Sequence, residues 1–195
     1  MDADMVKARI LDAAESLFFN QGIAVSGMDD VARAAEVAIA TLYKYGGSKD
    51  ELLSAVLRRR LDLWVEHWDA ARARADGPVD RGLAVFDALE TFRAAAAPTQ
   101  WCCFLATASE RPATTAAEQD PALTLTRQDS RVLGRRLRAD LEAADVPDPA
   151  AVAADLVLIY NGVLASLLRG SPEAPVRRAR ALAEARIRTA LTGAP

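Results

Sequence analysis

The sequence predicts an all-α protein in which a small N-terminal helix-turn-helix domain precedes a larger helical domain. Apolar residues recur at spacings of three and four along almost the whole chain, which is typical of amphipathic helices, and no segment shows the alternation of a strand. Gly and Pro signals divide the chain into segments of helical length. With 195 residues, 51% of them apolar, the chain can bury a substantial core, as one domain or as a small domain fused to a larger one.

The first predicted helix is amphipathic and ends near Gly22, which suits the left-handed conformation that closes a helix. Its buried face is formed by Val6, Ile10, Ala14, Leu17 and Phe18. Ser26 is the predicted N-cap of a second helix, and Asp29 places a negative charge in its first turn, where the helix dipole favours it. The inner face of this second helix consists of Met28, Val31, Ala32 and Ala35.

A third helix of about two turns is predicted from Ile39 to Tyr45, after a break at Glu36 and Val37. A helix this short does not persist alone in water, so packing through Val37 and Leu42 must hold it.

A fourth helix is predicted to begin at Lys49, because Ser48 and Glu51 have the spacing of a capping box. Its apolar stripe contains Leu53, Leu57, Leu61, Trp64 and Trp68, and it ends near Arg74. We therefore expect a helix-turn-helix domain over residues 1–48 and a second helical domain over residues 49–195.

The stretch from Arg9 to Leu52 resembles the DNA-binding domain of the tetracycline-repressor (TetR) family. The matching positions, in order and without a gap, are Ile10, Ala13, Ala14, Phe18, Gly22, Ser26, Val31, Ala32, Ala35, Val37, Thr41, Leu42, Tyr43, Ser48, Lys49 and Leu52. The resemblance implies that the helix from Ile39 to Tyr45 enters the major groove of DNA, while Tyr43 and Lys49 hold phosphates.

The chemistry of these residues agrees with that assignment. Lys49 lies at a helix N-terminus, which attracts anions, and a phenol such as that of Tyr43 can donate one hydrogen bond to a phosphate oxygen. Thr41 can contact a thymine methyl group, and Lys44 suits either the O6 and N7 atoms of guanine or a phosphate. The complete candidate set for DNA binding is Ser26, Ile39, Ala40, Thr41, Tyr43, Lys44, Tyr45 and Lys49.

Three positions depart from the family pattern. Glu36 stands where glycine is usual, and a non-glycine residue in a left-handed turn costs about 1–2 kcal/mol. Ala38 replaces a serine cap worth about 1 kcal/mol, and Gly46 replaces a bulky residue that would wedge the third helix against the fourth. We therefore expect a recognition helix that is less rigid than average and a modest affinity for DNA.

The net charge of −3 excludes a protein that coats nucleic acid through its overall field, so affinity must come from a few well-placed cations. The run from Arg58 to Arg60 is either a solvated helix face or a set of phosphate contacts. No Gly-rich phosphate loop, metal motif or activated nucleophile is visible, so we do not expect an enzyme. An all-helical enzyme and a protein-interaction module with a decayed helix-turn-helix are the competing interpretations.

The rest of the chain is predicted to be helical over residues 79–97, 99–110, 121–144, 149–168 and 172–191. Asp148 followed by Pro149 is a typical helix start. The helix over 149–168 is apolar around much of its circumference, so its surplus surface needs a second partner. We expect a homodimer formed through the helices 149–168 and 172–191, as the resemblance also implies. Such a dimer would bind a palindromic operator with half-sites about 34–36 Å apart or a multiple of that spacing.

Apolar walls with a few polar groups suit a small-molecule pocket, and the resemblance implies a repressor that releases DNA when an effector binds. The candidate pocket residues are Trp64, His67, Trp68, Phe86, Phe92, Trp101, Cys102, Phe104, Thr107 and Asn161. Aromatic residues at helical spacing can equally be ordinary core. Asn161 can line the pocket or form a hydrogen bond across the dimer.

We expect a cytoplasmic protein without a cofactor. The N-terminus lacks the pattern of a secretory signal, and the apolar stretch from Leu156 to Leu168 is too short to span a bilayer. The neighbouring thiols of Cys102 and Cys103 are expected to be reduced, although one with a lowered pKa could sense oxidants. Because His67 is the only histidine, a histidine metal site is not expected. The effector, the operator sequence and the direction of regulation stay open.

Overall fold

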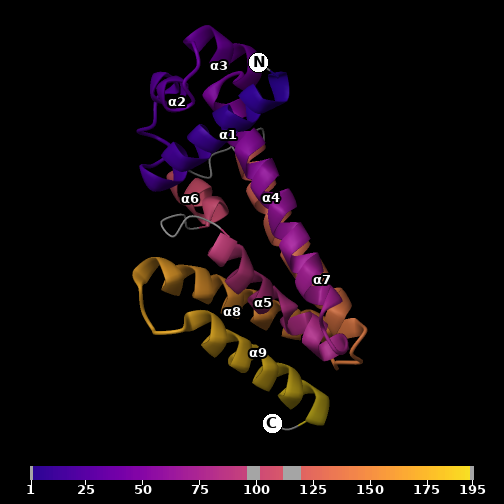
Figure 1. Cartoon of the computed structure of the whole chain (residues 1–195). Coiled ribbons are helices and arrows are strands. Elements are labelled where there is room, and N and C mark those ends of the chain that lie inside the picture. Colours follow the sequence, from indigo (N-terminus) through magenta and orange to yellow (C-terminus); the bar gives the residue numbers. More distant parts are fainter. Residues whose placement is uncertain (1, 96–101, 112–119, 194–195) are drawn as a thin grey trace. The chain divides into compact units, whose positions relative to one another are not determined.

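The computed structural model describes residues 2–95, 102–111 and 120–193, and it is helical throughout (Figure 1). The predicted all-α fold is confirmed. The described part of the chain contains α1 (Ala3–Asn20), α2 (Met28–Ala34), α3 (Ile39–Gly46), α4 (Lys49–Ala73), α5 (Pro78–Ala95), α6 (Cys103–Glu110), α7 (Pro121–Glu142), α8 (Pro149–Arg169) and α9 (Pro175–Thr192).

The chain forms two compact units. The first unit comprises residues 1–62 and 99–129, and the second comprises residues 63–98 and 130–195, so α4 and α7 contribute to both. The first unit therefore contains more than the three N-terminal helices, because the start of α4, α6 and the start of α7 belong to it. The division of the chain at residue 48 stays a prediction about function.

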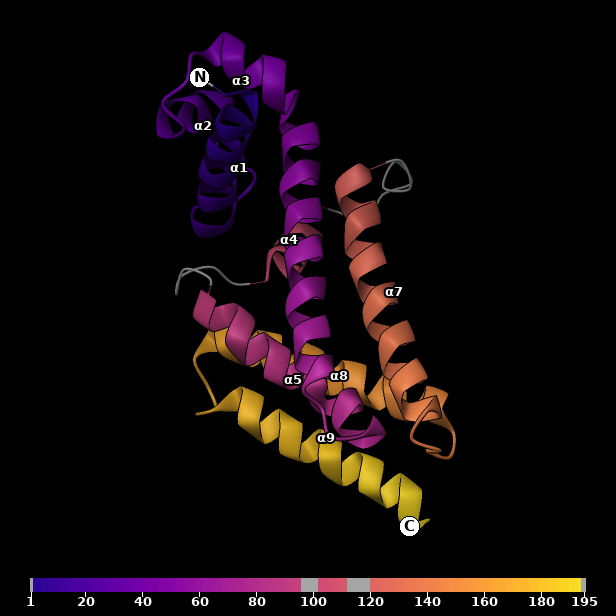
Figure 2. The same ribbon diagram turned by 45° about the vertical axis from the view of Figure 1, so that its right-hand side comes forward.

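In the first unit, α1, α2 and α3 pack against one another (Figure 2). The largest fully buried side chains here are Ile10 and Phe18 of α1, Leu42 of α3, and Leu52, Leu53 and Leu57 of α4. The apolar stripes that the sequence predicts for these helices are thus the surfaces that meet. This packing holds the two short helices α2 and α3, which are too short to be stable alone.

In the second unit, α9 packs against both α5 and α8 (Figure 1). The core contains a cluster of aromatic rings on α4, α5 and α8, in which Trp64 lies 5.9 Å from Trp68, 5.5 Å from Phe92 and 6.0 Å from Tyr160. Asp140 of α7, only 3% exposed, accepts a hydrogen bond of 3.0 Å from Arg72 Nε of α4. A buried charge of this kind needs such a partner.

Two helix boundaries and one length argument need correction. The helix predicted from residue 99 begins at Cys103, and residues 99–101 lie outside the described residues. The last helix begins at Pro175 rather than at residue 172, after Ala174 in a left-handed conformation. The helix α8 (Pro149–Arg169) is longer than the apolar stretch from Leu156 to Leu168 on which the length argument was based. By length and composition alone it is long enough to cross a bilayer, so the argument from shortness fails.

Candidate DNA-binding surface

The third helix buries one face and exposes the other. Leu42 is fully buried against the neighbouring helices, whereas Ile39 is 39% exposed and Tyr43 is 53% exposed. Ala40 and Lys44 are also exposed, and Thr41 and Tyr45 are half-buried. The candidate DNA-binding side chains of α3 therefore lie on or beside the exposed face of this short helix, which is the arrangement that groove binding requires.

The turn between α2 and α3 contains the unusual Glu36, whose φ of 52° is left-handed, so the turn keeps the shape that favours glycine. Arg9 of α1 compensates for it. Its guanidinium donates hydrogen bonds to the carbonyl oxygen of Ala35, to that of Glu36 at 3.1 Å and to the Glu36 carboxylate at 3.3 Å. Sequence reasoning missed Arg9, because it lies 27 residues from Glu36 and no local pattern links them.

The other two departures from the family pattern also have a structural description. Ala38 is the N-cap of α3 and provides no side-chain hydrogen bond, as predicted. At Gly46 a Cβ atom would lie 3.3 Å from Leu42 Cδ1 and 3.4 Å from Leu52 Cδ1. The glycine therefore lets the end of α3 approach α4 closely, in a place where a bulky side chain would need a rearranged core.

Lys49 is held in place by the backbone of the turn between α1 and α2. Its Nζ atom donates a hydrogen bond of 3.1 Å to the carbonyl oxygen of Ala24. The predicted capping box that starts α4 is confirmed, because Glu51 N donates to Ser48 Oγ at 3.2 Å and Ser48 N donates to the Glu51 carboxylate at 2.7 Å. The hydrogen bond that the Ser48 backbone N–H donates to the carboxylate is the main cause that lowers the pKa of Glu51, and the Ser48 side chain lowers it further.

Ser26 does not cap α2, so that prediction is wrong. Its hydroxyl is 2% exposed and donates to the carbonyl oxygens of Leu17 at 3.1 Å and Gly22 at 2.7 Å. The N-cap is Gly27, whose N–H donates to the Asp30 carboxylate at 3.3 Å. Ser26 therefore stabilises the turn from within and turns its hydroxyl away from solvent. The pairing of Gly27 with Asp30 has capping-box spacing and was detectable in the sequence.

The run from Arg58 to Arg60 fits neither predicted interpretation as a whole. Arg58 is exposed, but Arg59 donates hydrogen bonds of 2.6 Å to both Asp12 and Glu15 of α1. Arg60 is 8% exposed and lies 3.2 Å from the Glu15 carboxylate. The run therefore ties α4 to α1 rather than forming a solvated face.

The end of α6 contacts the same N-terminal helices, a connection that sequence reasoning missed. The Glu110 carboxylate accepts hydrogen bonds from Ile23 N at 3.1 Å and Ala24 N at 2.8 Å. The next residue, Arg111, pairs with Asp50 in the first turn of α4 and with Asp120 at 2.6 Å. These partners are far apart in sequence, so no motif marks them.

The other end of α6 carries two thiols, of which Cys103 is buried and Cys102, the N-cap, is half-buried. Burial raises the pKa of Cys102 to about 11 and that of Cys103 well above its usual range. A thiol with a raised pKa is a poor nucleophile, which argues against oxidant sensing by either. Burial also raises the pKa of Asp129 in the same unit to about 7. Among the described residues, no three His, Cys, Asp or Glu side chains gather as a metal site.

The candidate pocket residues fall into separate groups. Trp64, Trp68 and Phe86 are buried in the aromatic cluster of the second unit, where His67 also contacts Phe92 edge to face at 5.4 Å. Cys102, Phe104 and Thr107 belong to the first unit, and Asn161 is exposed on α8. Trp101 lies outside the described residues. These residues stay predictions for an effector site.

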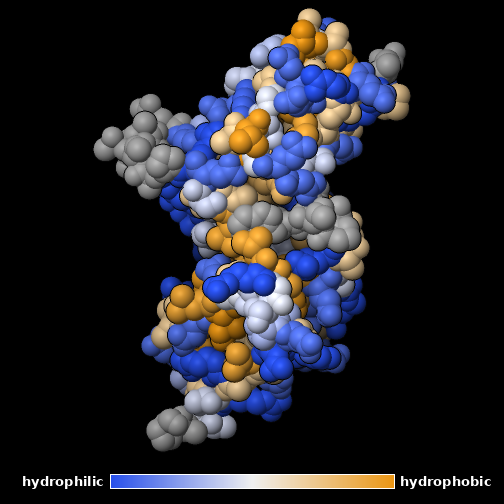
Figure 3. Space-filling view, turned by 90° about the vertical axis from the view of Figure 1, so that its left-hand side faces the viewer, coloured by the Kyte–Doolittle hydropathy of each residue, from blue (hydrophilic) through white to orange (hydrophobic). Residues whose placement is uncertain are grey.

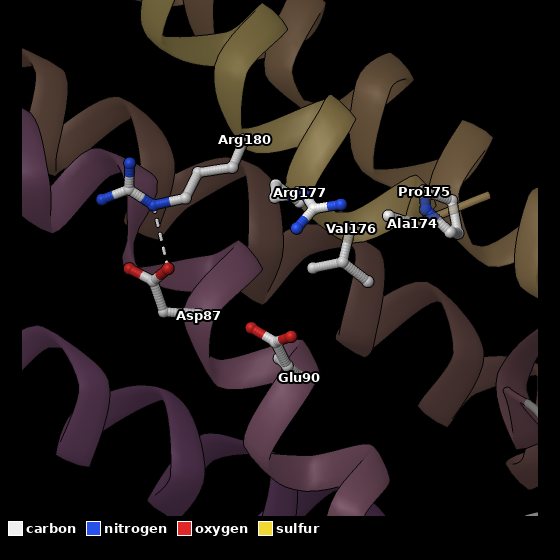
Figure 4. A pocket seen from close by; sticks show the side chains of 7 residues that line it. All are labelled: Asp87, Glu90, Ala174, Pro175, Val176, Arg177 and Arg180. Carbon is white, nitrogen blue, oxygen red and sulfur yellow. Dashed lines mark hydrogen bonds and ion pairs between the residues drawn. The ribbon is translucent and has the colours of Figure 1, made fainter. Parts of the chain in front are cut away.

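A hollow on the second unit was not predicted from the sequence. It lies between α5 and α9 and is lined by Asp87, Glu90, Ala174, Pro175, Val176, Arg177 and Arg180 (Figure 4). Arg180 Nε donates a hydrogen bond of 2.9 Å to Asp87 across it. The lining is mostly charged, unlike the apolar walls typical of effector pockets.

The N-terminal helices match a known family of regulators. Residues 10–56 match the family model described as bacterial regulatory proteins, tetR family. This part of the chain belongs to the TetR family. Two curated relatives each align with about three tenths of the chain. The chain is 43% identical over 56 residues to the uncharacterized HTH-type transcriptional regulator Rv1255c of Mycobacterium tuberculosis. This alignment covers 29% of the chain and 28% of the relative. The chain is also 37% identical over 60 residues to the HTH-type transcriptional repressor SCO4008 of Streptomyces coelicolor. This alignment covers 31% of the chain and 31% of the relative.

Almost the whole chain has the fold of a solved structure. The crystal structure of SCO4454, a TetR-family transcriptional regulator from Streptomyces coelicolor, covers 96% of both chains with a TM-score of 0.83 and 24% identity. The sequence match to these curated relatives thus covers less than a third of the chain, whereas the likeness in fold covers 96% of it.

Proposed function

We propose that this TetR-family protein is a sequence-specific DNA-binding transcriptional regulator, a cytoplasmic homodimeric repressor that a small-molecule effector releases from a palindromic operator. The observation that carries the proposal is the third helix, which exposes Ile39 and Tyr43 while Leu42 anchors it. Lys49 supports it, because its ammonium lies at the start of α4 and has donors to spare for a phosphate.

The structure also bears on the competing module with a decayed helix-turn-helix. That interpretation depended on Glu36, Ala38 and Gly46. Arg9 supports the turn at Glu36, and Leu42 and Leu52 occupy the space beside Gly46. The helix-turn-helix geometry is therefore retained in spite of the three departures, and this favours DNA binding.

A gel-shift experiment on the region upstream of its own gene, with salt titration, tests the proposal. We expect specific retardation whose affinity falls with salt, with a log–log slope of about −0.9 for each phosphate contact. A randomised DNA pool is the control for sequence preference. If the protein shows none across that pool, DNA recognition by α3 is excluded and the module interpretation gains.

We assign the dimer interface to α8 and α9. On α8, Leu158 is 70% exposed and Leu168 is 53% exposed, and on α9 Leu182 is 62% exposed. Figure 3 shows one face of the molecule, on which hydrophobic residues lie among hydrophilic ones. Leucines exposed to this degree on neighbouring helices are typical of a surface that a second copy covers.

We assign effector binding to the aromatic cluster of the second unit. Trp68 is fully buried, and its Nε1–H has no hydrogen-bond partner among the described residues. A buried donor left unpaired costs about 1–3 kcal/mol, which an acceptor on a planar apolar ligand would offset. DNA release by aromatic carbonyl compounds tests this, and an unchanged response in Trp68→Phe would remove Trp68 from the site.

A further inference from the structure

Glu110, the last residue of α6, and Arg111, which follows it, contact the two segments beside Lys49: the turn at Ala24 and the next residue, Asp50. We propose that Glu110 and Arg111 are positioning residues for the contact between Lys49 and DNA, so that α6 sets the strength of DNA binding through them. This inference rests on the proposed function. It adds two residues outside the helix-turn-helix to the DNA-binding apparatus.

The first link runs through the backbone of one residue, Ala24, in the α1–α2 turn. Lys49 Nζ donates to the Ala24 carbonyl oxygen at 3.1 Å, and the N–H of Ala24 donates to Glu110 at 2.8 Å. Glu110 also accepts from Ile23 N at 3.1 Å. Both carboxylate oxygens are therefore engaged by successive backbone N–H groups, and hydrogen bonds to a charged acceptor are stronger than neutral ones. Because Ala24 is the acceptor for Lys49, the carboxylate that holds this turn also holds the lysine.

The second link reaches Lys49 through its neighbour in sequence. Arg111 pairs with the carboxylate of Asp50, which follows Lys49 in the first turn of α4, and with Asp120 at 2.6 Å. Asp120 in turn accepts a hydrogen bond of 2.8 Å from Ala122 N at the start of α7. Arg111 is thus anchored on one side and holds the start of α4 on the other, while its side chain is only 20% exposed.

This arrangement leaves Lys49 able to bind DNA. An ammonium group has three donors, so the bond to Ala24 uses one and leaves two for a phosphate. A lysine side chain that is already ordered also loses less conformational freedom when it binds. Loosening of the turn by loss of Glu110 should therefore weaken the phosphate contact without changing which bases are read.

A double-mutant cycle on operator affinity tests the inference. It compares the unmodified protein with Glu110→Gln, Lys49→Ala and the variant that carries both substitutions. The charge-matched control is Glu66→Gln, because Glu66 is an exposed glutamate of α4 in the second unit. We expect Glu110→Gln to weaken binding about fivefold to tenfold on its own and less than about twofold when Lys49 is already alanine, because coupled residues are non-additive. Asp50→Asn, which removes the charged partner of Arg111, tests the second link in the same way. We expect it to weaken operator binding when Lys49 is present and to have little effect when Lys49 is already alanine.

The salt slope and the melting temperature complete the experiment. Glu110→Gln should bring the slope closer to zero, as Lys49→Ala does, and thermal unfolding identifies variants that lose structure. Equal effects of Glu110→Gln in both backgrounds would overturn the inference, because the glutamate would then act independently of Lys49. If Lys49→Ala leaves affinity and salt slope unchanged, the inference also falls, whereas the proposed function fails only if the unmodified protein has no sequence preference.

Discussion

Arg9 and Glu36 form an ion pair of 3.3 Å that ties the first helix to the turn of the helix-turn-helix. The Glu36 side chain is 85% exposed, so the ion pair alone is worth at most about 1 kcal/mol. Arg9 also donates to the carbonyl oxygens of Ala35 and Glu36, which end the second helix. These backbone bonds explain how a glutamate is tolerated where glycine is usual.

Arg9→Ala should therefore destabilise the protein by about 1–3 kcal/mol, because it leaves the carbonyl groups of the turn without their donor. Glu36→Gly should instead stabilise it by up to about 1 kcal/mol, since it relieves a left-handed cost of about 1–2 kcal/mol and loses only an exposed ion pair. Urea unfolding followed by circular dichroism measures both changes. A destabilised Glu36→Gly variant would show that the carboxylate contributes more than its exposure suggests.

Thr41→Ala and Lys49→Ala should have different effects on DNA binding. Loss of the Thr41 side chain should relax preference at one base position, whereas loss of Lys49 should weaken all sequences about equally and reduce the salt slope by about 1. Selection from a randomised operator library, combined with salt titration, separates the two. Equal, sequence-independent losses from both substitutions would remove Thr41 from the base-reading residues.

Asp129 should make the protein less stable as pH rises. Its pKa is about 7 in the folded state and near 3.8 when unfolded, so between these values the folded state binds more protons than the unfolded state. Stability is therefore greatest below about pH 4 as far as this group is concerned, and it falls as pH rises to about 7. This difference between the folded and unfolded pKa corresponds to at most about 4 kcal/mol, because solvent screens the partly exposed Asp129 side chain.

The neutral variant Asp129→Asn removes this dependence. Its stability relative to the unmodified protein should be greater at pH 8 than at pH 5, as measured by urea unfolding at each pH. Exposed Glu66→Gln provides the comparison for a carboxylate in solvent. A difference between Asp129→Asn and the unmodified protein that is the same at both values of pH would contradict the raised pKa.

Leu158→Glu combined with Leu182→Glu should convert a dimer into a monomer. Both leucines are exposed in the single chain, so the substitutions should not disturb the core, but they would bury unpaired charges in the proposed interface. Light scattering coupled to size-exclusion chromatography measures the mass, and circular dichroism verifies the helical content. A folded variant that keeps the mass of a dimer would place the interface elsewhere.

Much of the fold was predictable because its signals are local. Ser48 and Glu51 mark the start of α4, and Asp148 followed by Pro149 marks the start of α8, where the Asp148 side chain accepts from Ala151 N at 3.1 Å. Each of these caps lies within three residues of its partner. The helix type follows from periodicity for the same reason, since residues three and four apart share a face.

The sequence alone determined the helical class, the order of the helices and the candidate recognition helix from Ile39 to Tyr45, because all of these depend on contacts within a few residues. Only the tertiary structure decided that Arg9 supports the turn at Glu36, that Arg60 is buried beside Glu15, and that Glu110 holds the turn at Ala24. The last contact joins residues 86 positions apart. Charged partners at such distances are brought together by packing of the apolar faces, and no sequence period records which of many carboxylates and cations will meet.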